Sequence, residues 1–373
     1  MDKKSYKKFN ICLISAFLTV LLGVAALNVA VNPYNIFPFC GIAKYKPEAK
    51  LQERVTKLIG FKLDKRKINS VFLGNSRTDY SIDRDYFKKV TGLEAENLAM
   101  GGIVIEEYPE LLDLIFKIHP EVKNIFLGTD FIMFSGSSVF DEKSKATFEK
   151  NPNLTTTELC TALFSFSSTR DSVWTLVRNL LKIKGGAVYN LNGTRHPVPD
   201  KRYREIFGMS VLEYVIKYKN FDYNPGKLEI IRKIKSVCDE RGVGLHLFVM
   251  PTHLADMYLI SSFPNTKNAY YEWKKDLTQI APVYDFQYPS DFMNESISDD
   301  MQYFFDISHV TPTVGNMIID FFDSGNSEIG RFETSEYIDL INRTDSCELA
   351  VSILEDPELK NFVDKIKGGE NAI

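Results

Sequence analysis

The sequence predicts an α/β fold with a parallel central sheet, and two observations support this prediction. Short apolar runs rich in β-branched and aromatic residues alternate along the chain with longer segments of helical periodicity. Such alternation is typical of βαβ units, in which a helix connects one strand to the next parallel strand. The composition, with 44% hydrophobic and 25% charged residues over 373 positions, is that of a globular protein with a sizeable core.

The charge and the cysteines exclude some classes of function. A net charge of −4 argues against a nucleic-acid partner, because nucleic-acid-binding domains usually carry a basic surface. The five cysteines are scattered, and none has the spacing of a metal site or a CxxC motif. Most are expected to act as buried small hydrophobes. A disulfide among Cys40, Cys160 and Cys347 stays open, because a sequence cannot show it. No metal or organic cofactor is expected.

An apolar segment follows four lysines near the N-terminus, Lys3, Lys4, Lys7 and Lys8. Residues 11–31 are apolar or small except for Ser15, Thr19 and Asn28, and this run is long enough to cross a bilayer. Basic residues before a span favour a cytoplasmic N-terminus and an extracytoplasmic remainder. We therefore predict an uncleaved signal-anchor over residues 1–43 and a single-pass location in the cell membrane. A cleaved secretory signal and a buried soluble helix are the alternatives.

The predicted α/β domain covers residues 44–330 and begins with a lysine-rich helical connector over 44–67. Five strands are predicted, at 69–74, 96–100, 123–128, 244–250 and 282–286. Apolar residues at helical spacing predict helices at about 83–90, 105–115, 228–239 and 270–280. A last helix is expected to start at Thr311 as N-cap, with Pro312 at its first position.

The strand–helix alternation stops between residues 131 and 223. Helical patterns near 156–164 and 171–183 indicate a helical insertion there. This insertion either shapes a substrate site over the carboxyl edge of the sheet or is a subdomain without such a role. Residues 331–373 form an acidic, amphipathic C-terminal helical tail, for which a packing helix and a frayed end are both open.

A serine follows the first predicted strand directly. The apolar run 71–73 stops at Gly74, and Ser76 lies in the polar cluster behind it. In open α/β sheets, ligands meet the chain at the carboxyl ends of strands. Near the other end of the chain, Asp306 and His309 lie three residues apart before the last helix. Since a serine hydroxyl needs a base, and the base needs an orienting carboxylate, we predict a Ser76–His309–Asp306 triad.

Acyl-transfer chemistry also requires hydrogen-bond donors for the oxyanion. The backbone N–H groups of Ser76 and Gly102 are the candidates, since glycine lets the backbone approach a ligand closely. Arg77 and Asp130 are expected at the same sheet edge. His253 follows the fourth strand, where it contacts either substrate or only its own loop. The chain lacks the GxSxG motif of α/β-hydrolases.

Three motifs together resemble the SGNH (GDSL-like) hydrolase superfamily. They are Gly74-Asn75-Ser76-Arg77, residues 97–102 after the second strand, and Asp306-x-x-His309. The anchor followed by Asn32-Pro33-Tyr34 is similar to the membrane-anchored branch of this superfamily. That branch includes the alginate O-acetylation proteins and the D-alanyl-lipoteichoic-acid protein.

The resemblance covers about 69–130 and 242–323 and implies a flavodoxin-like three-layer α/β/α sandwich, the SGNH hydrolase fold. It also implies Ser76 as nucleophile, Gly102 as an oxyanion donor, and ester chemistry on surface glycans. One position departs from the family pattern, because Asp130 stands where the third block usually supplies an asparagine to the oxyanion hole. An ionised Asp130 would repel an oxyanion. Either it has another role, or the hole uses two donors, or activity is reduced.

These expectations combine into a membrane-anchored extracytoplasmic serine esterase or O-acyltransferase. It would act on a cell-envelope polysaccharide or another acylated glycan through an acyl-serine intermediate. A transferase would also need a membrane partner that delivers the acyl group. A non-catalytic glycan-binding or scaffold protein on the same fold is the alternative, which Asp130 favours. An esterase for soluble substrates, held at the membrane, is a third hypothesis.

Overall fold

The computed structural model describes residues 3–37, 41–43, 46–47, 53–137, 151–183, 187–189, 195–197, 203–288, 290–298, 301–324, 331–333 and 357–368. The chain divides into two compact units by its internal contacts. The first unit comprises residues 1–65 and 151–193, and the second comprises 66–150 and 194–373. The segment predicted as one insertion is therefore shared between the two units.

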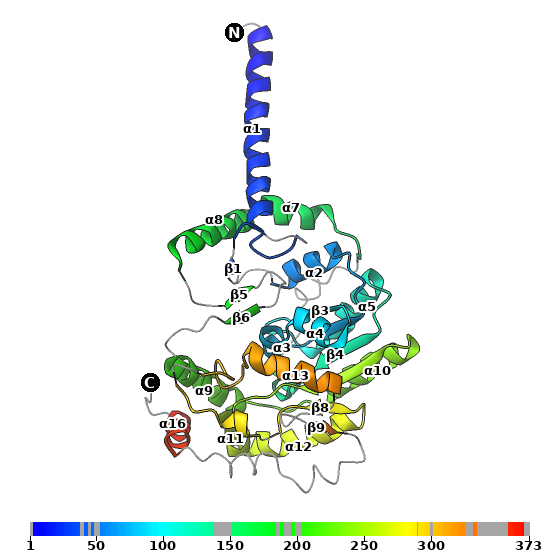
Figure 1. Ribbon diagram of the computed structural model, residues 1–373, viewed down its shortest axis with the longest axis vertical. Helices are drawn as coiled ribbons and strands as arrows, with labels where there is room; N and C mark the ends of the chain where they lie inside the picture. Colours follow the sequence, from blue (N-terminus) through cyan, green and yellow to red (C-terminus); the bar gives the residue numbers. More distant parts are fainter. Residues whose placement is uncertain are drawn as a thin grey trace. The chain divides into compact units, whose positions relative to one another are not determined.

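The first unit contains the N-terminal helix and the segments that contact it (Figure 1). Within α1, residues Ser5–Val31 are long and apolar enough to cross a membrane, as the sequence predicted for this part of the chain. The elements of this unit are α1 (Lys3–Val31), β1 (Lys46–Pro47), α2 (Glu53–Leu63), α7 (Thr156–Phe164), α8 (Phe166–Leu181) and β5 (Ala187–Tyr189). Strands β1 and β5 pair antiparallel, and both α7 and α8 contact α1.

The second unit is built on a sheet of five parallel strands, which confirms the predicted α/β class. The strand order is β3-β2-β4-β7-β8, and a sixth strand, β9, adds antiparallel to β8. The strands are β2 (Ser70–Leu73), β3 (Ala95–Asn97), β4 (Asn124–Gly128), β7 (Gly244–Val249), β8 (Val283–Asp285) and β9 (Arg331–Glu333). Each predicted strand overlaps an observed one, while β9 falls in the segment assigned to the tail. If the five parallel strands are numbered 1 to 5 in chain order, their order across the sheet is 2-1-3-4-5. This order is common in doubly wound folds.

Nine α-helices are described in this unit. They are α3 (Ser76–Ser81), α4 (Arg84–Thr91), α5 (Tyr108–Ile118), α9 (Tyr203–Lys219), α10 (Leu228–Glu240), α11 (Leu254–Ser262), α12 (Pro264–Thr278), α13 (Pro312–Ser324) and α16 (Pro357–Lys367). Shorter elements are η1 (Ile105–Glu107), η2 (Phe131–Phe134), β6 (Arg195–Pro197), η3 (Pro225–Lys227) and η4 (Asp291–Asn294). The four internal helices predicted from periodicity all overlap observed helices, and α13 begins at Pro312 as expected.

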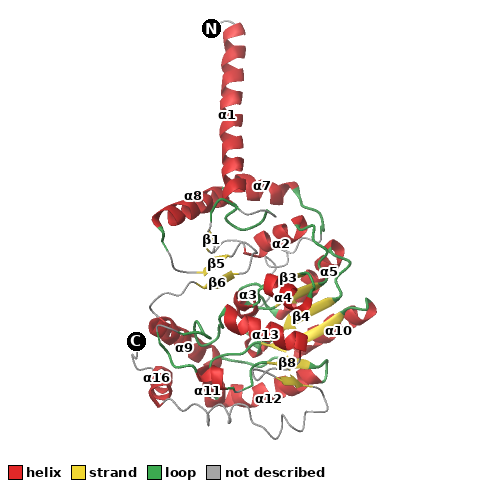
Figure 2. Ribbon diagram, viewed as in Figure 1, coloured by secondary structure: helices red, strands yellow, loops and turns green. Residues whose placement is uncertain are grey.

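Helices cover the sheet on both faces (Figure 2). Strand β2 is buried at all four positions, as a parallel strand covered on both sides requires. On one face, Phe72 and Phe126 stack on each other and contact Phe87 of α4 and Phe322 of α13. Elsewhere in the unit, α10 contacts both β7 and α5. The aromatic layer under α13 fixes that helix, and with it the loop that precedes it.

Ser76 is the first residue of a helix, whereas the sequence placed it in a polar cluster before the first predicted helix. The predicted helix began near Asp83, but a separate helix, α3, starts at Ser76. The Asn75 side chain explains the earlier start, since its Oδ1 accepts a hydrogen bond from the N–H of Arg77 at 2.9 Å and so caps α3. Asp83 caps the next helix, α4, and Gly92 ends it in a left-handed conformation with φ of 74°.

Helix α13 packs closely against α3 at Gly315. A methyl group at this position would lie 1.8 Å from the carbonyl oxygen of Ser81. We expect Gly315→Ala to lower the free energy of unfolding by about 1–3 kcal/mol, because two helix backbones must separate to admit the methyl group. Urea unfolding measures this. Gly60→Ala is the matched control, since the nearest atom is 3.8 Å away there, and its stability should be unchanged or raised. Equal stability of both variants would contradict this packing.

Candidate active site

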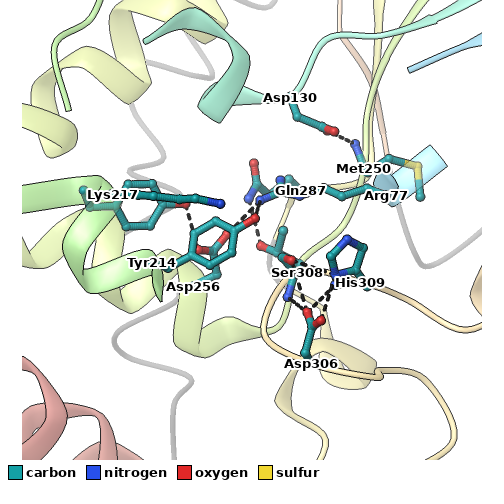
Figure 3. Close-up of polar contacts among 12 residues, drawn as sticks. Arg77, Asp130, Tyr214, Lys217, Met250, Asp256, Gln287, Asp306, Ser308 and His309 are labelled. Carbon is teal, nitrogen blue, oxygen red and sulfur yellow. Dashed lines mark hydrogen bonds and ion pairs between the residues drawn. The ribbon is translucent and has the colours of Figure 1, made fainter. Parts of the chain in front are cut away.

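The three side chains predicted as a triad lie in hydrogen-bond contact. Ser76 Oγ is 2.8 Å from His309 Nε2. His309 Nδ1 is 2.8 Å from Asp306 Oδ2, and Figure 3 shows this contact. With Nδ1–H donating to the carboxylate, the unprotonated Nε2 faces the serine hydroxyl. This order of contacts allows the histidine to accept a proton from the serine.

The backbone of its own loop holds Asp306 in place. Its Oδ1 accepts hydrogen bonds from the N–H of Ser308 at 2.7 Å, the hydroxyl of Ser308 at 3.1 Å and the N–H of His309 at 2.9 Å. Burial by itself raises the pKa of Asp306, but the charge of His309 and these hydrogen bonds outweigh burial and lower the pKa to about 2. Asp306 is therefore ionised at neutral pH, and both of its oxygens are engaged.

The triad opens into a cavity of about 610 Å³. Its walls come from the loops after β2, β3 and β4, from α9 and from the loop before α13. The lining residues are Asn75, Ser76, Arg77, Gly102, Ile103, Val104, Ile132, Met133, Ile206, Met209, Ser210, Glu213, Tyr214, Lys217, Asp306, Ser308 and His309. Gly102 has a φ of 64°, a left-handed conformation that favours glycine. The cavity thus lies at the carboxyl ends of the parallel strands, where ligands bind in doubly wound folds.

Helix α9 forms one wall of this cavity, and the sequence analysis did not predict it. Its buried residues include Phe207, Val211, Tyr214 and Tyr218. Their spacing of three and four residues is helical and could have identified α9. Within the described residues, η2 and α9 are the parts of the predicted insertion that reach the cavity.

Sequence reasoning also missed a stack of side chains behind His309. The ring of Tyr80 lies 4.9 Å from the His309 ring. The Arg195 guanidinium lies 4.5 Å from the Tyr80 ring, and Arg195 Nε is 2.6 Å from Asp79 Oδ2. Arg195 and Asp79 are both buried. This cation–π contact and ion pair support Tyr80 against the imidazole. No sequence pattern links Arg195 to His309, so no signal was present to find it.

Arg77 is buried beside Ser76 within a network of polar groups (Figure 3). Its Nη2 donates to the Tyr214 hydroxyl at 3.1 Å and lies 3.7 Å from Asp256 Oδ2. Tyr218 donates to Asp256 Oδ1 at 2.7 Å. Burial lowers the pKa of Arg77, but Tyr214, Asp130 and Asp256 together raise it above its ordinary value. The Arg77 guanidinium is therefore a buried cation that Tyr214, Asp130 and Asp256 stabilise.

Asp130 is fully buried and does not line the cavity. Its Oδ1 accepts a hydrogen bond from the N–H of Met250 at 2.9 Å, which joins the ends of β4 and β7 (Figure 3). Burial raises the pKa of the Asp130 carboxyl, and the charge of Arg77 opposes this rise. This geometry supports the first of the three alternatives for Asp130, a role other than in the oxyanion hole.

His253 is also fully buried and does not line the cavity, although its N–H donates to the carbonyl of Ile307 in the triad loop at 3.0 Å. Its Nδ1 accepts from the N–H of Ala255 at 3.1 Å and so caps α11. Its Nε2 then carries the proton and donates to the carbonyl of Glu295 at 2.8 Å. Both ring nitrogens are engaged, so the geometry favours the loop role over a contact with substrate.

Metal-binding groups and thiols give no further site in the described part of the chain. There, no three His, Cys, Asp or Glu side chains are grouped as a metal site. Cys160 is a free thiol, and Cys40 and Cys347 lie outside the described residues.

Comparisons of the chain with protein-family models, with curated proteins and with solved structures found no match. The function must therefore be inferred from the residues of the site.

Proposed function

We propose that this protein is a membrane-anchored serine esterase or O-acyltransferase. One observation carries the proposal, namely the continuous hydrogen-bond chain from Ser76 through His309 to Asp306, with two contacts of 2.8 Å, at a cavity of about 610 Å³. A serine without a catalytic role would not need an oriented imidazole whose other nitrogen is fixed by a carboxylate.

The proposed reaction uses only groups of this chain. Ser76 Oγ attacks the carbonyl carbon of an ester while its proton moves to His309 Nε2. The tetrahedral intermediate collapses, the bond to the leaving alkoxide breaks, and His309 gives its proton to that oxygen. Water or a sugar hydroxyl then resolves the acyl-serine by the same steps in reverse. The N–H groups of Ser76 and Gly102, both cavity residues, are the proposed oxyanion donors.

The lining of the cavity suits an acylated glycan. An apolar part, Ile103, Val104, Ile132 and Met133, can cover an acyl group. A polar part on α9, with Ser210, Glu213 and Lys217, can hydrogen-bond the hydroxyl groups of a sugar. We therefore propose a cell-envelope polysaccharide or related glycan as the substrate class.

The SGNH assignment and the topology belong to the same proposal. The strand order 2-1-3-4-5 and the Gly74-Asn75-Ser76-Arg77 motif support a flavodoxin-like SGNH domain. The lysines before α1 support a cytoplasmic N-terminus and an extracytoplasmic domain. Transfer would require a membrane protein that delivers the acyl group, and product analysis with a glycan acceptor would separate transfer from hydrolysis.

Covalent labelling of the full-length protein with a fluorophosphonate probe tests the proposal. We expect labelling of the wild type and none of Ser76→Ala, because only an activated serine attacks the probe phosphorus. Ser210→Ala is the matched control, since Ser210 lines the same cavity from α9, and this variant should keep its labelling. Equal labelling of Ser76→Ala and wild type would refute the assignment. A folded wild type that takes no label would favour the non-catalytic alternative.

A further inference from the structure

Helix α8 of the first unit has most of its apolar residues on the outside. Exposed apolar residues on or next to this helix are Phe166, Val173, Trp174, Leu180, Leu181 and Ile183. Phe166 and Leu180 are 82% and 81% exposed. The buried positions are instead small and polar, namely Ser168, Ser172 and Thr175. A surface helix of a water-soluble domain shows the opposite pattern.

The polar face of α8 packs against the end of α1. Ser172 Oγ donates to Asn28 Oδ1 at 2.8 Å. Asn28 Nδ2 donates in turn to Thr169 Oγ1 at 3.2 Å and to the carbonyl of Leu163, in α7, at 2.8 Å. Asn28, the last polar residue within the apolar run, is thus paired by α7 and α8. Small side chains also let the α1 and α8 backbones approach closely.

The contact with α1 lies at the level where a bilayer would end. A hydrocarbon core of about 30 Å needs about 20 helical residues. Counted from Phe9, directly after the lysines, about 20 residues end at Asn28. Figure 1 shows α7 and α8 at this base of α1, extending to opposite sides of it. Helix α8, with its exposed apolar residues, therefore meets α1 at the end of the apolar segment.

We propose that α8, with the adjoining end of α7, lies in the headgroup boundary of the bilayer that α1 crosses. Its apolar face enters the upper acyl region, as in interfacial amphipathic helices. Trp174 suits this depth because tryptophan prefers the membrane–water interface. Arg178 and Lys182 can reach anionic headgroups, whereas Arg170 pairs with Asp171. The first unit is then held by a span and a flat helix together, which limits tilting about α1. This proposal rests on α1 as anchor and is independent of the chemistry at Ser76.

Tryptophan fluorescence of the full-length protein in vesicles tests this placement. The chain has two tryptophans, and Trp273 is fully buried in the other unit. The vesicles contain phosphatidylcholine and phosphatidylglycerol, with or without acyl chains brominated near the headgroup. We expect the brominated lipid to quench wild-type emission and acrylamide in the water to leave it unchanged. The Trp174→Phe variant should lose the lipid-dependent quenching, because Trp273 contacts neither quencher.

Two variants sharpen the test. Leu180→Asp combined with Leu181→Asp should reduce quenching by the brominated lipid and expose Trp174 to acrylamide. Ile216→Asp, which changes an apolar residue on α9 that is 56% exposed, against 62% for Leu181, should leave both unchanged. An alkaline wash before the measurement confirms that α1 is inserted. A failure of α1 to insert can therefore be distinguished from a different position of α8. Quenching of Trp174 by acrylamide in washed vesicles would overturn the proposal. Protection from both quenchers would also overturn it and would indicate that protein covers α8.

Discussion

Replacing Asp306 by Asn is expected to lower the rate of fluorophosphonate labelling, and of any ester hydrolysis, about 10⁴-fold. Oδ1 of Asp306 accepts two backbone N–H groups, from Ser308 and His309. In the variant, the side-chain oxygen of the asparagine must take the place of Oδ1, because the NH₂ group of the amide cannot accept the two backbone hydrogen bonds. The NH₂ group then faces His309 Nδ1, which becomes the acceptor. The ring proton moves to Nε2, and His309 can no longer take the proton of Ser76.

Second-order labelling rates of the two proteins between pH 5 and pH 9 measure this effect. Because the pKa of Asp306 is lowered to about 2, the carboxylate stays ionised over this range, and the deficit should not vary with its titration. Asp320→Asn is the matched control, since Asp320 is an exposed carboxylate on α13 that bonds Tyr86. It should label at the wild-type rate. A loss of less than about 10-fold in Asp306→Asn would mean that this carboxylate does not set the tautomer.

Replacing Arg77 by Met is expected to lower the free energy of unfolding at pH 7 by about 3–5 kcal/mol. The substitution keeps most of the side-chain volume but removes the cation between two buried carboxyl groups, Asp130 and Asp256. Each would be left without the charge that stabilises its ionised form. The size of the loss comes from this uncompensated burial rather than from the strength of a single ion pair.

The loss of unfolding free energy in Arg77→Met is expected to depend on pH. Burial raises the pKa of Asp130 and of Asp256 in the folded protein, and Arg77 opposes the rise. Without Arg77 both pKa values rise further. A carboxyl group whose folded pKa exceeds its unfolded value favours folding at low pH, and this contribution is lost as the pH rises through the folded pKa. The deficit of Arg77→Met should therefore be largest at pH 7 and smaller near pH 5.

Urea unfolding at the two pH values measures this deficit, and two variants serve as comparisons. Arg232→Met removes an exposed pair with Glu229 and should cost less than about 1 kcal/mol. Adding Asp256→Asn to Arg77→Met should restore part of the lost stability, because one buried carboxylate is then neutral. If Arg77→Met proves no less stable than Arg232→Met, the two carboxyl groups do not depend on Arg77.

Local patterns determined much of the architecture of this protein. Four of the five parallel strands are short, mainly apolar runs that stop at glycine, proline or polar clusters, and such signals act within a few residues; β3, Ala95–Asn97, is the exception. The finding that residues Ser5–Val31 of α1 are long and apolar enough to cross a membrane follows from the length of the apolar run alone. The candidate triad could be proposed because a serine after a strand, and an aspartate three residues before a histidine, are each recognisable in the sequence.

Contacts between distant segments decided the rest, because burial depends on what the fold brings together and not on neighbours in the chain. Ser76 and His309 are 233 positions apart, and the packing of α13 on α3 at Gly315 accompanies their 2.8 Å contact. Arg195 reaches Tyr80 only through the fold. The sequence of α8 fixes its amphipathic pattern, but only its packing on Asn28 shows that the polar face is inside and the apolar face outside.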